Sequence, residues 1–276
     1  MKDEKEEVVS MMSCKTILLA ALIFFIPQGI AAQMDETASD EIVVFAAASL
    51  TGAFGEIGDI YENRTDMKVA INFDGSQALR TQIENGAYSD VVAFASTKHM
   101  NKLMGEGLMN NSSVCIFTKN KIALIVPRGN PAGINNLSDL ARPGIKIVIG
   151  TKDVPVGDYA LQIIDRLAND FAYGPDYKKN VMANIISQET TVSYVVTKAA
   201  LGEADVGFAY VSDVTEDMAS KVDRIEIPDE YNVIAEYPMG LSAECRNPGM
   251  AQEFMDLVQS ADGRAVLERY GFSPAA

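Results

Sequence analysis

The chain has 276 residues, with 38 Asp and Glu residues against 23 Lys and Arg residues, and its formal net charge is −15. A hydrophobic content of 48% is typical of globular proteins and excludes disordered and fibrous classes. The acidic excess argues against a nucleic-acid partner, because phosphate backbones are bound by clustered Lys and Arg. The single histidine, His99, leaves little material for a histidine-based catalytic triad or a histidine-rich metal site.

The N-terminal region contains an unbroken apolar run, Ile17–Ile26, which follows Lys15 and precedes the small pair Ala31-Ala32. Ten residues rise only about 15 Å as a helix, half of the ~30 Å hydrocarbon core of a membrane. Residues 1–32 are therefore predicted to be a signal peptide cleaved near Ala32, or to remain as an N-terminal anchor, and a buried core helix is the alternative. Both predicted states imply export, to the periplasm or the outer face of the cytoplasmic membrane.

The three cysteines leave their redox state open. Cys14 precedes the apolar run, whereas the lipid-bearing cysteine of a lipoprotein would follow it. Cys115 and Cys245 could form one disulfide in an exported protein, or remain as two buried free thiols. No spacing among the three resembles a zinc site.

From residue 40 onward, short apolar strands alternate with segments of helical period. The predicted strands are Ile42–Ala47, Lys68–Phe73, Asp90–Ala95, Ile122–Val126, Lys146–Gly150, Ala183–Ile186, Val206–Tyr210 and Arg224–Ile227. The predicted helices are Leu50–Arg64, Gln77–Asn85, Thr97–Glu106, Asn136–Leu140, Gly157–Asn169, Thr191–Leu201, Pro248–Leu257 and Asp262–Tyr270. Strands separated by amphipathic segments indicate βαβ units and an α/β fold with a parallel sheet.

The strands are more numerous than one small sheet needs, so the sequence favours two α/β lobes. We expect the first lobe at residues 40–118 plus 238–276 and the second at 119–237, because the C-terminal helices would return to the first lobe. The crossover segments are then expected near Phe117–Asn120 and Ala235–Pro238.

Four predicted strand-to-helix junctions are rich in small and hydroxyl-bearing residues. They are FAAASLTGAF at Ser49, NFDGSQAL at Ser76, GTKDVPVGDY at Val156 and QETTVS at Val192. Ligands of open α/β sheets bind at such ends. A helix N-terminus leaves up to four N–H donors unsatisfied and carries the positive end of the helix dipole. The junctions could therefore hold a tetrahedral oxyanion without Lys or Arg, and plain N-capping is the alternative for each.

Five segments, in a fixed order from about Glu41 to Phe272, carry a family resemblance: FAAASLTGAF, FDGSQALRTQIENGAYSDVVAFAS, DVPVGDYA, GEADVGFAYVSD and ERYGF. They resemble the extracytoplasmic molybdate-binding proteins of ABC importers. The resemblance implies a two-lobed, periplasmic-binding-protein-like (type II) α/β fold with a hinge and a ligand cleft between the lobes. It implies capture of molybdate or tungstate and delivery to the membrane permease of the importer. We expect a monomer without a cofactor.

Carried over motif by motif, the resemblance implies two serine donors, Ser49 and Ser76. Val156 and Val192 match positions that give backbone N–H donors, and Tyr210 matches a phenol donor. Because all these groups are neutral, dipoles must stabilise the charge of the dianion. Phosphate, which is partly protonated at pH 7, would bring an O–H group with no acceptor facing it. Sulfate would satisfy the donors, so its rejection must rest on the longer Mo–O and W–O bonds.

Several carboxylates beside these positions depart from the pattern. Asp153 and Glu189 are candidate extra metal ligands, by similarity to archaeal relatives in which two carboxylates make the metal six-coordinate. Solvated acids or helix caps are the alternative for both, and Asp74 also lies close to Ser76. Two other functions stay open: a receptor for another oxyanion such as sulfate or phosphate, or an enzyme on the same scaffold. We do not expect an enzyme, because the chain lacks G-x-S-x-G, G-x-G-x-x-G and P-loop signatures.

Overall fold

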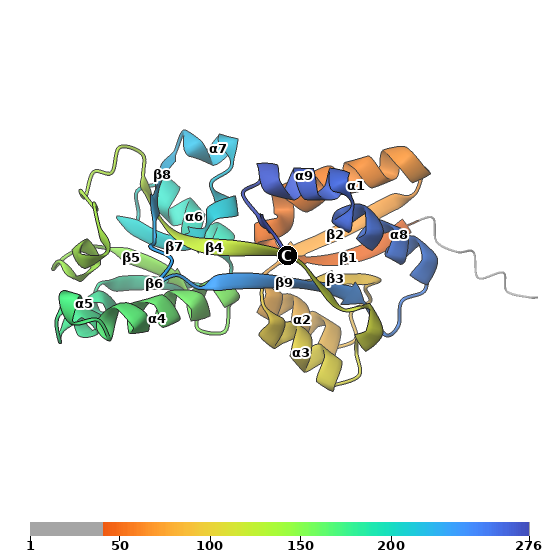
Figure 1. Ribbon diagram of the computed structural model, residues 1–276, viewed down its shortest axis with the longest axis horizontal. Helices are drawn as coiled ribbons and strands as arrows, with labels where there is room; N and C mark the ends of the chain where they lie inside the picture. Colours follow the sequence, from red (N-terminus) through yellow and green to blue (C-terminus); the bar gives the residue numbers. More distant parts are fainter. Residues whose placement is uncertain (1–40, 276) are drawn as a thin grey trace, which may run out of the picture. The chain divides into compact units, whose positions relative to one another are not determined.

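The computed structural model describes residues 41–275 (Figure 1), which belong to one compact unit. The predicted signal peptide or anchor, residues 1–32, and Cys14 lie outside the described residues. Within the part of the chain that the structure describes, no helix combines the length and the apolarity that a membrane crossing requires.

The described strands form one mixed sheet in the order β2-β1-β3-β9-β4-β7-β5-β6, and β8 and β10 pair with β4. Their bounds are β1 Glu41–Ala47, β2 Lys68–Asp74, β3 Val91–Ala93, β4 Cys115–Pro127, β5 Ile147–Gly150, β6 Ile185–Glu189, β7 Val206–Tyr210, β8 Val222–Glu226, β9 Ile234–Leu241 and β10 Ser273–Pro274. Strand β1 runs parallel to β2 and β3, and β5 runs parallel to β6 and β7. Strands β9 and β4 are antiparallel to each other and to their neighbours β3 and β7. The predicted parallel sheet is thus parallel among β1–β3 and among β5–β7, and antiparallel at β4 and β9, where the two halves join, and at β8 and β10, which pair with β4.

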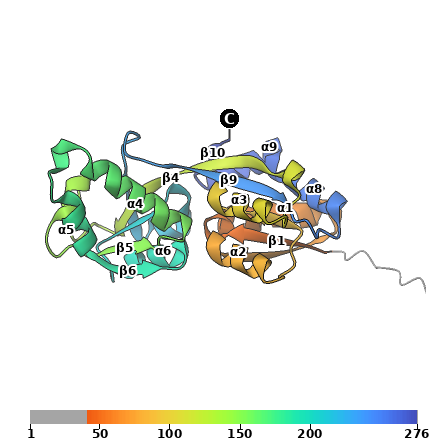
Figure 2. The ribbon, with the colours of Figure 1, turned by 90° about the horizontal axis from the view of Figure 1, so that it is seen from below.

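We call β1–β3 with their helices the first half of the sheet, and β5–β8 with theirs the second half (Figures 1 and 2). The helices of the first half are α1 Thr51–Thr65, α2 Ser76–Glu84, α3 Thr97–Gly105, α8 Pro248–Gln259 and α9 Ala261–Arg269. Those of the second half are α4 Pro155–Ala168, α5 Tyr177–Ala183, α6 Val192–Ala200 and α7 Glu216–Ala219. Short 3-10 helices are η1 Ala48–Leu50, η2 Asn111–Ser113, η3 Leu137–Ala141, η4 Phe171–Tyr173 and η5 Val211–Asp213.

Helices cover both faces of each half of the sheet. In Figure 1, α1, α8 and α9 lie on one face of the first half, whereas α2 and α3 lie on the other. The C-terminal helices α8 and α9 thus pack beside α1. The expected lobe boundaries near residues 118 and 237 fall inside β4 and β9, the strands that connect the two halves, so the division into lobes stays a prediction.

Every predicted strand overlaps an observed strand, and Val206–Tyr210 has the observed bounds. The sequence missed β9 and the first part of β4, which we expected as crossover segments. Pro238 argues against a strand interior because it cannot donate to the ladder. Here it pairs with Ile116 next to an irregularity in the register of β4 and β9. Helices α5 and α7 are too short to show a clear period, and Asn136–Leu140 forms the 3-10 helix η3 instead of an α-helix.

Cys115 and Cys245 are free thiols, so the free-thiol alternative holds, although both residues are only half-buried. The Cys115 Sγ atom lies 3.7 Å from Gln259 Oε1, and the Cys245 Sγ atom lies 3.4 Å from Asp90 Oδ1. Burial raises the pKa of the Cys115 thiol, and burial together with Asp90 raises that of Cys245 to about 12. Both thiols therefore stay protonated near neutral pH.

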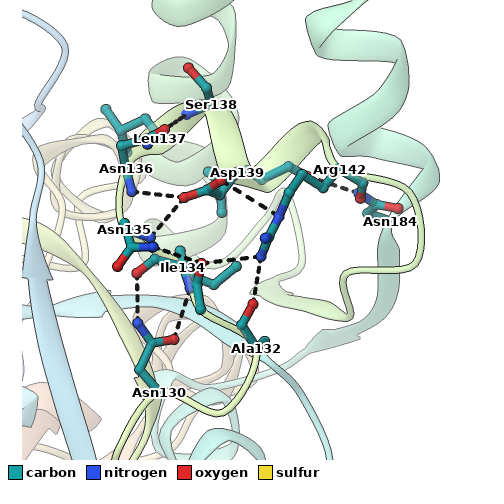
Figure 3. A network of polar contacts seen from close by, with 12 residues as sticks. Asn130, Ala132, Ile134, Asn135, Asn136, Leu137, Ser138, Asp139, Arg142 and Asn184 are labelled. Atoms are coloured by element: carbon teal, nitrogen blue, oxygen red, sulfur yellow. Dashed lines mark hydrogen bonds and ion pairs between the residues drawn. The ribbon is translucent and has the colours of Figure 1, made fainter.

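The connection between β4 and β5 is held by its own polar side chains (Figure 3). Asn130, which has a left-handed φ of 49°, bonds to both the N–H and the carbonyl group of Ile134. Asp139 Oδ2 accepts the N–H groups of two preceding residues, and Arg142 donates to the carbonyl of Ala132 at 2.6 Å. Asn184, before β6, donates to the carbonyl of Arg142. These bonds satisfy the backbone of an irregular segment and anchor it to the second half.

Candidate functional site

All five predicted binding residues line one small pocket. Its lining residues are Ala47, Ala48, Ser49, Gly75, Ser76, Ala95, Val154, Pro155, Val156, Val192 and Tyr210. The volume open to the centre of a water-sized sphere is about 20 Å³. One water needs about 10–15 Å³ by this measure, so the pocket suits a compact guest.

The pocket lies where successive strands of both halves end and helices begin. Strand β1 leads into η1, β2 into α2, β5 into α4 and β6 into α6. Ser76 is the first residue of α2, Val192 is the first of α6, and Val156 is the second of α4. Their N–H groups are among the first four of each helix, which have no acceptor inside the helix. The pocket therefore faces backbone donors and the positive ends of three helix dipoles.

Proline fixes the start of α4 at the pocket. Pro155 occupies the first helical position, where its missing N–H group costs nothing and its fixed φ suits a helix. Gly157 packs tightly behind it, because an added Cβ atom would lie 2.1 Å from the carbonyl oxygen of Thr151. This close packing sets the position of the Val156 N–H group.

Both pocket serines are buried, and each has a hydrogen-bond partner beside the pocket. Ser76 Oγ accepts the N–H group of Ala95 at 3.0 Å, so its own proton is free to be donated. Ser49 Oγ lies 2.9 Å from the hydroxyl group of Tyr237. Ser76 is 1% exposed and Ser49 8%. Water therefore cannot compete freely with a guest for either hydroxyl group.

Tyr210, at the end of β7, contributes a buried phenol whose oxygen has no hydrogen-bond partner within the described residues. An unsatisfied buried polar group costs about 1–3 kcal/mol, and such groups are rare in native structures. Burial and the neighbouring Tyr237 raise the pKa of this phenol well above its ordinary value, so it stays protonated. An acceptor in the pocket would satisfy it.

No charged side chain appears among the residues that line the pocket. The nearest carboxyl group in sequence to Tyr210 is that of Asp213, whose Oδ2 atom accepts the Tyr210 N–H group at 2.8 Å. Burial raises the pKa of Asp213 to about 7, against the opposing effect of this hydrogen bond. Asp213 therefore carries only part of a negative charge near neutral pH.

The two candidate carboxylate ligands do not line the pocket. Glu189 pairs with Lys198 Nζ at 2.6 Å and accepts a hydrogen bond from Ser187. Burial alone would raise the pKa of Glu189, but these two partners lower it. Asp153 is exposed, and no cluster of three or more metal-ligating side chains occurs in residues 41–275. Nothing in this geometry supports their predicted role as metal ligands.

Three further contacts join the two halves beside the pocket. His99 Nε2, on α3, lies 3.0 Å from the carbonyl oxygen of Asp153; because a carbonyl only accepts, this nitrogen carries the proton. Tyr159, on α4, donates to the carbonyl of Ala95 at 3.2 Å. At Gly75, an added Cβ atom would lie 2.7 Å from the carbonyl oxygen of Thr190.

Sequence reasoning missed His99, Tyr159 and Tyr237 as parts of this region. Each lies outside the quoted junctions or faces a residue far away in the chain, so no local pattern signals its contact. A glycine directly before a helix-starting serine was a usable signal at Gly75.

Comparison with known proteins gives a consistent picture. Residues 42–273 match the sequence model of the family described as bacterial extracellular solute-binding protein. The molybdate-binding protein ModA of Mycobacterium tuberculosis is 33% identical over 233 residues, which is 84% of this chain and 84% of that protein. The substrate-binding domain of a putative molybdenum ABC transporter from Clostridium difficile matches with a TM-score of 0.65 and 26% identity, covering 86% of this chain and 99% of that one. The periplasmic molybdate-binding protein of Azotobacter vinelandii matches in fold, with a TM-score of 0.75 and 21% identity over 85% of this chain and 100% of that one.

The raised pKa of Asp213 predicts a pH dependence of stability. Its value of about 7 in the folded protein exceeds the ordinary 3.8, so the folded state binds more protons between these values. The free energy of unfolding should therefore fall as pH rises from about 4 to 7. Asn in place of Asp213 keeps an acceptor for the Tyr210 N–H group but cannot ionise. We expect Asp213→Asn to match the wild type near pH 4 and to be more stable at pH 8.

Urea unfolding of both proteins across pH 4–8 measures this difference. If the free energies of unfolding of the wild type and Asp213→Asn changed in parallel with pH, the titration would not belong to Asp213. The acidic surface adds the same pH dependence to both proteins and does not affect this comparison.

Proposed function

The chain belongs to the family of bacterial extracellular solute-binding proteins, and on this premise we propose that it captures molybdate or tungstate and delivers it to the membrane permease of an ABC importer. Membership makes it a solute-binding protein of an ABC transporter rather than an enzyme. The molybdate-binding relative that shares 33% identity over most of both chains supports the choice of ligand. The proposed place of action is outside the cytoplasm.

The single observation that carries the proposal is the unsatisfied hydroxyl group of Tyr210 in a buried pocket of neutral donors. The pocket offers this phenol, the Ser49 and Ser76 hydroxyl groups, and the N–H groups at the starts of α4 and α6. A tetrahedral dianion has four oxygen atoms that only accept, so it can satisfy all these donors at once. Preoriented dipoles in a site without water stabilise such a charge strongly, because they need no rearrangement.

The chemistry of the donors also supports selection among oxyanions. A hydrogen phosphate ion carries an O–H group, which needs a hydrogen-bond acceptor. No carboxylate stands among the residues that line the pocket to accept it. Sulfate is fully deprotonated but smaller than molybdate. In a pocket shaped for the longer metal–oxygen bonds, the distances between the donors and the sulfate oxygen atoms would be longer and the hydrogen bonds weaker. Larger organic anions are disfavoured by the small volume.

Binding and cleft closure are coupled in this proposal. Ser49 and Ser76 belong to the first half of the sheet, and Val156, Val192 and Tyr210 belong to the second. An ion bound to both halves favours the arrangement in which they touch, and shifts the population toward it. The contacts at His99, Tyr159 and Gly75 support a closed form that a permease could distinguish from an open one.

Isothermal titration of the purified protein with molybdate, tungstate, sulfate and phosphate tests the proposal. We expect one-to-one binding of molybdate and tungstate with far weaker binding of the other two, because the donors match a larger, fully deprotonated ion. Tight binding of sulfate or phosphate alone would favour the other oxyanion receptor. If none of the four binds, the oxyanion proposal fails.

The same titration tests the site residues. Ser76→Ala and Tyr210→Phe should each weaken molybdate binding by about 1–3 kcal/mol, as expected for the loss of one hydrogen bond to a charged group. Tyr177→Phe is the matched control, because its buried hydroxyl group donates to the carbonyl of Leu137 away from the pocket. Wild-type affinity in both site variants would refute their assignment.

Closure makes a separate prediction at Gly75. Its φ of −60° and ψ of 136° suit any residue, so Gly75→Ala should fold normally. The added methyl group would press on the carbonyl of Thr190 and hold the halves apart, and we expect about tenfold weaker molybdate binding, because the binding-competent form is less populated. Gly55→Ala is the control, since within the described residues its added Cβ would meet no atom within 4 Å beyond its chain neighbours and the backbone of its own helix.

Titration gives the affinity of both glycine variants, and urea unfolding without ligand gives their stability. Equal molybdate affinities in Gly75→Ala and Gly55→Ala would show that contact at Thr190 does not limit closure.

A further inference from the structure

A buried chain of polar side chains leads from the pocket to the two strands that join the halves. Ser49 Oγ lies 2.9 Å from the hydroxyl group of Tyr237, on β9. The side chain of Asn120, on β4, also acts on the phenol of Tyr237 and opposes the rise of its pKa. Asn120 in turn donates to Ser212 Oγ at 2.8 Å. Tyr237 is 0% and Asn120 1% exposed, so water does not enter this chain freely.

The sheet register explains why these two side chains meet. Asn120 pairs with Ala235 across β4 and β9, and Tyr237 is two residues beyond Ala235 on the same strand. Residues two apart on a strand point to the same face of the sheet, and diagonal neighbours across a strand pair are within reach of long side chains. Asn120 and Tyr237 therefore share the face that borders the pocket.

The orientation of the Asn120 amide is fixed by its backbone neighbour. Its Oδ1 atom accepts the N–H group of Lys121 at 2.9 Å, and a backbone N–H group can only donate. The Nδ2 atom must then lie on the side of the amide that faces away from the Lys121 N–H group, where it can donate two hydrogen bonds. One goes to Ser212 Oγ, and the other faces the phenol of Tyr237.

This orientation determines the direction of the remaining hydrogen bonds. The Tyr237 oxygen faces the Asn120 amide, which can only donate on this side, and has one proton of its own. A buried hydroxyl proton requires an acceptor, and the structure offers it Ser49 Oγ. Burial raises the pKa of Tyr237 well above its ordinary value, although the contacts with Ser49 and Asn120 oppose the shift, so the proton stays on the phenol. Ser49 therefore accepts from Tyr237 and has its own proton left for the pocket.

We propose that Asn120 and Tyr237 are positioning residues that hold the Ser49 hydroxyl group as a hydrogen-bond donor to the bound oxyanion, and that they thereby select fully deprotonated ions against protonated ones. The inference rests on the proposed function and adds to it the residues that set the polarity of the site. Without the Tyr237 hydroxyl group, Ser49 Oγ would be free to rotate and to accept a proton from the guest. The pocket would then tolerate the O–H group of hydrogen phosphate.

Tyr237→Phe tests this inference, with molybdate and inorganic phosphate as ligands in titrations at pH 7. We expect molybdate affinity to fall about tenfold, the usual scale for one lost hydrogen bond near a charge, while phosphate affinity stays level or rises. The ratio of the two affinities should therefore fall at least about tenfold, the change that 1.4 kcal/mol represents. A purely structural role would weaken both ligands alike and leave the ratio unchanged.

Tyr61→Phe is the matched control, because Tyr61 is also buried and its hydroxyl group donates to the carbonyl of Met250 at 3.0 Å, away from the pocket. It should leave the ratio unchanged. A second comparison uses Ser49→Ala. If Tyr237 acts through Ser49, adding Tyr237→Phe to Ser49→Ala should change the ratio far less than it does in the wild type, and the cycle should be strongly non-additive.

The outcomes separate the two proposals. Wild-type protein that binds no oxyanion would overturn the proposed function and this inference with it. Wild-type binding with a ratio unchanged in Tyr237→Phe, or an equal change in the Ser49→Ala background, would overturn the positioning role alone. If Tyr237→Phe does not fold, as judged by its unfolding transition against Tyr61→Phe, Asn120→Leu replaces it, with the same expected fall in the ratio and the same contrary result.

Discussion

The site depends on one constraint: hydrogen-bond donors are buried in a small pocket without a charged side chain to accompany them. Donors at helix starts have no acceptor within their own helix, and Tyr210 adds a phenol that finds no partner among residues 41–275. A guest that only accepts is the natural complement of such a pocket. This constraint accounts for a site built largely from backbone groups and small residues, and it explains how a valine can belong to it.

The donors are held in position by hydrogen bonds and packing contacts from both halves of the sheet. Ala95 fixes Ser76, and Tyr237 contacts Ser49 from a strand that joins the halves. Pro155 and the close packing of Gly157 hold the start of α4. Because the groups that hold the donors are themselves buried, each half of the sheet presents its own donors in a fixed orientation. Preorganisation of this kind lowers the entropic cost of ordering the chain on binding, so the affinity depends mainly on how well the ion fits the donors.

The motifs of the sequence contained most of the site but little of its surroundings. Ser49, Ser76 and the starts of α4 and α6 follow from strand-to-helix junctions that can be read locally, and all of them reach one pocket. The acidic residues beside the motifs lie outside the lining of this pocket. Proximity in sequence placed Asp153 and Glu189 near the site, but the Glu189 carboxylate is paired with Lys198 and Asp153 does not line the pocket. The direction of a side chain at a junction depends on its packing, which a single sequence does not encode in any local pattern.

The sequence by itself determined the alternation of strands and helices, the junctions that supply donors, and the absence of catalytic signatures, because these properties are local. Only the tertiary structure decided that β9 is a strand despite Pro238, that His99 faces Asp153, and that Tyr237 and Asn120 lie behind Ser49. Ser49 and Tyr237 are 188 residues apart in the chain. Contacts over such separations arise from the pairing of β4 with β9, where each strand finds its partner through the packing of the whole sheet rather than through any neighbour in sequence.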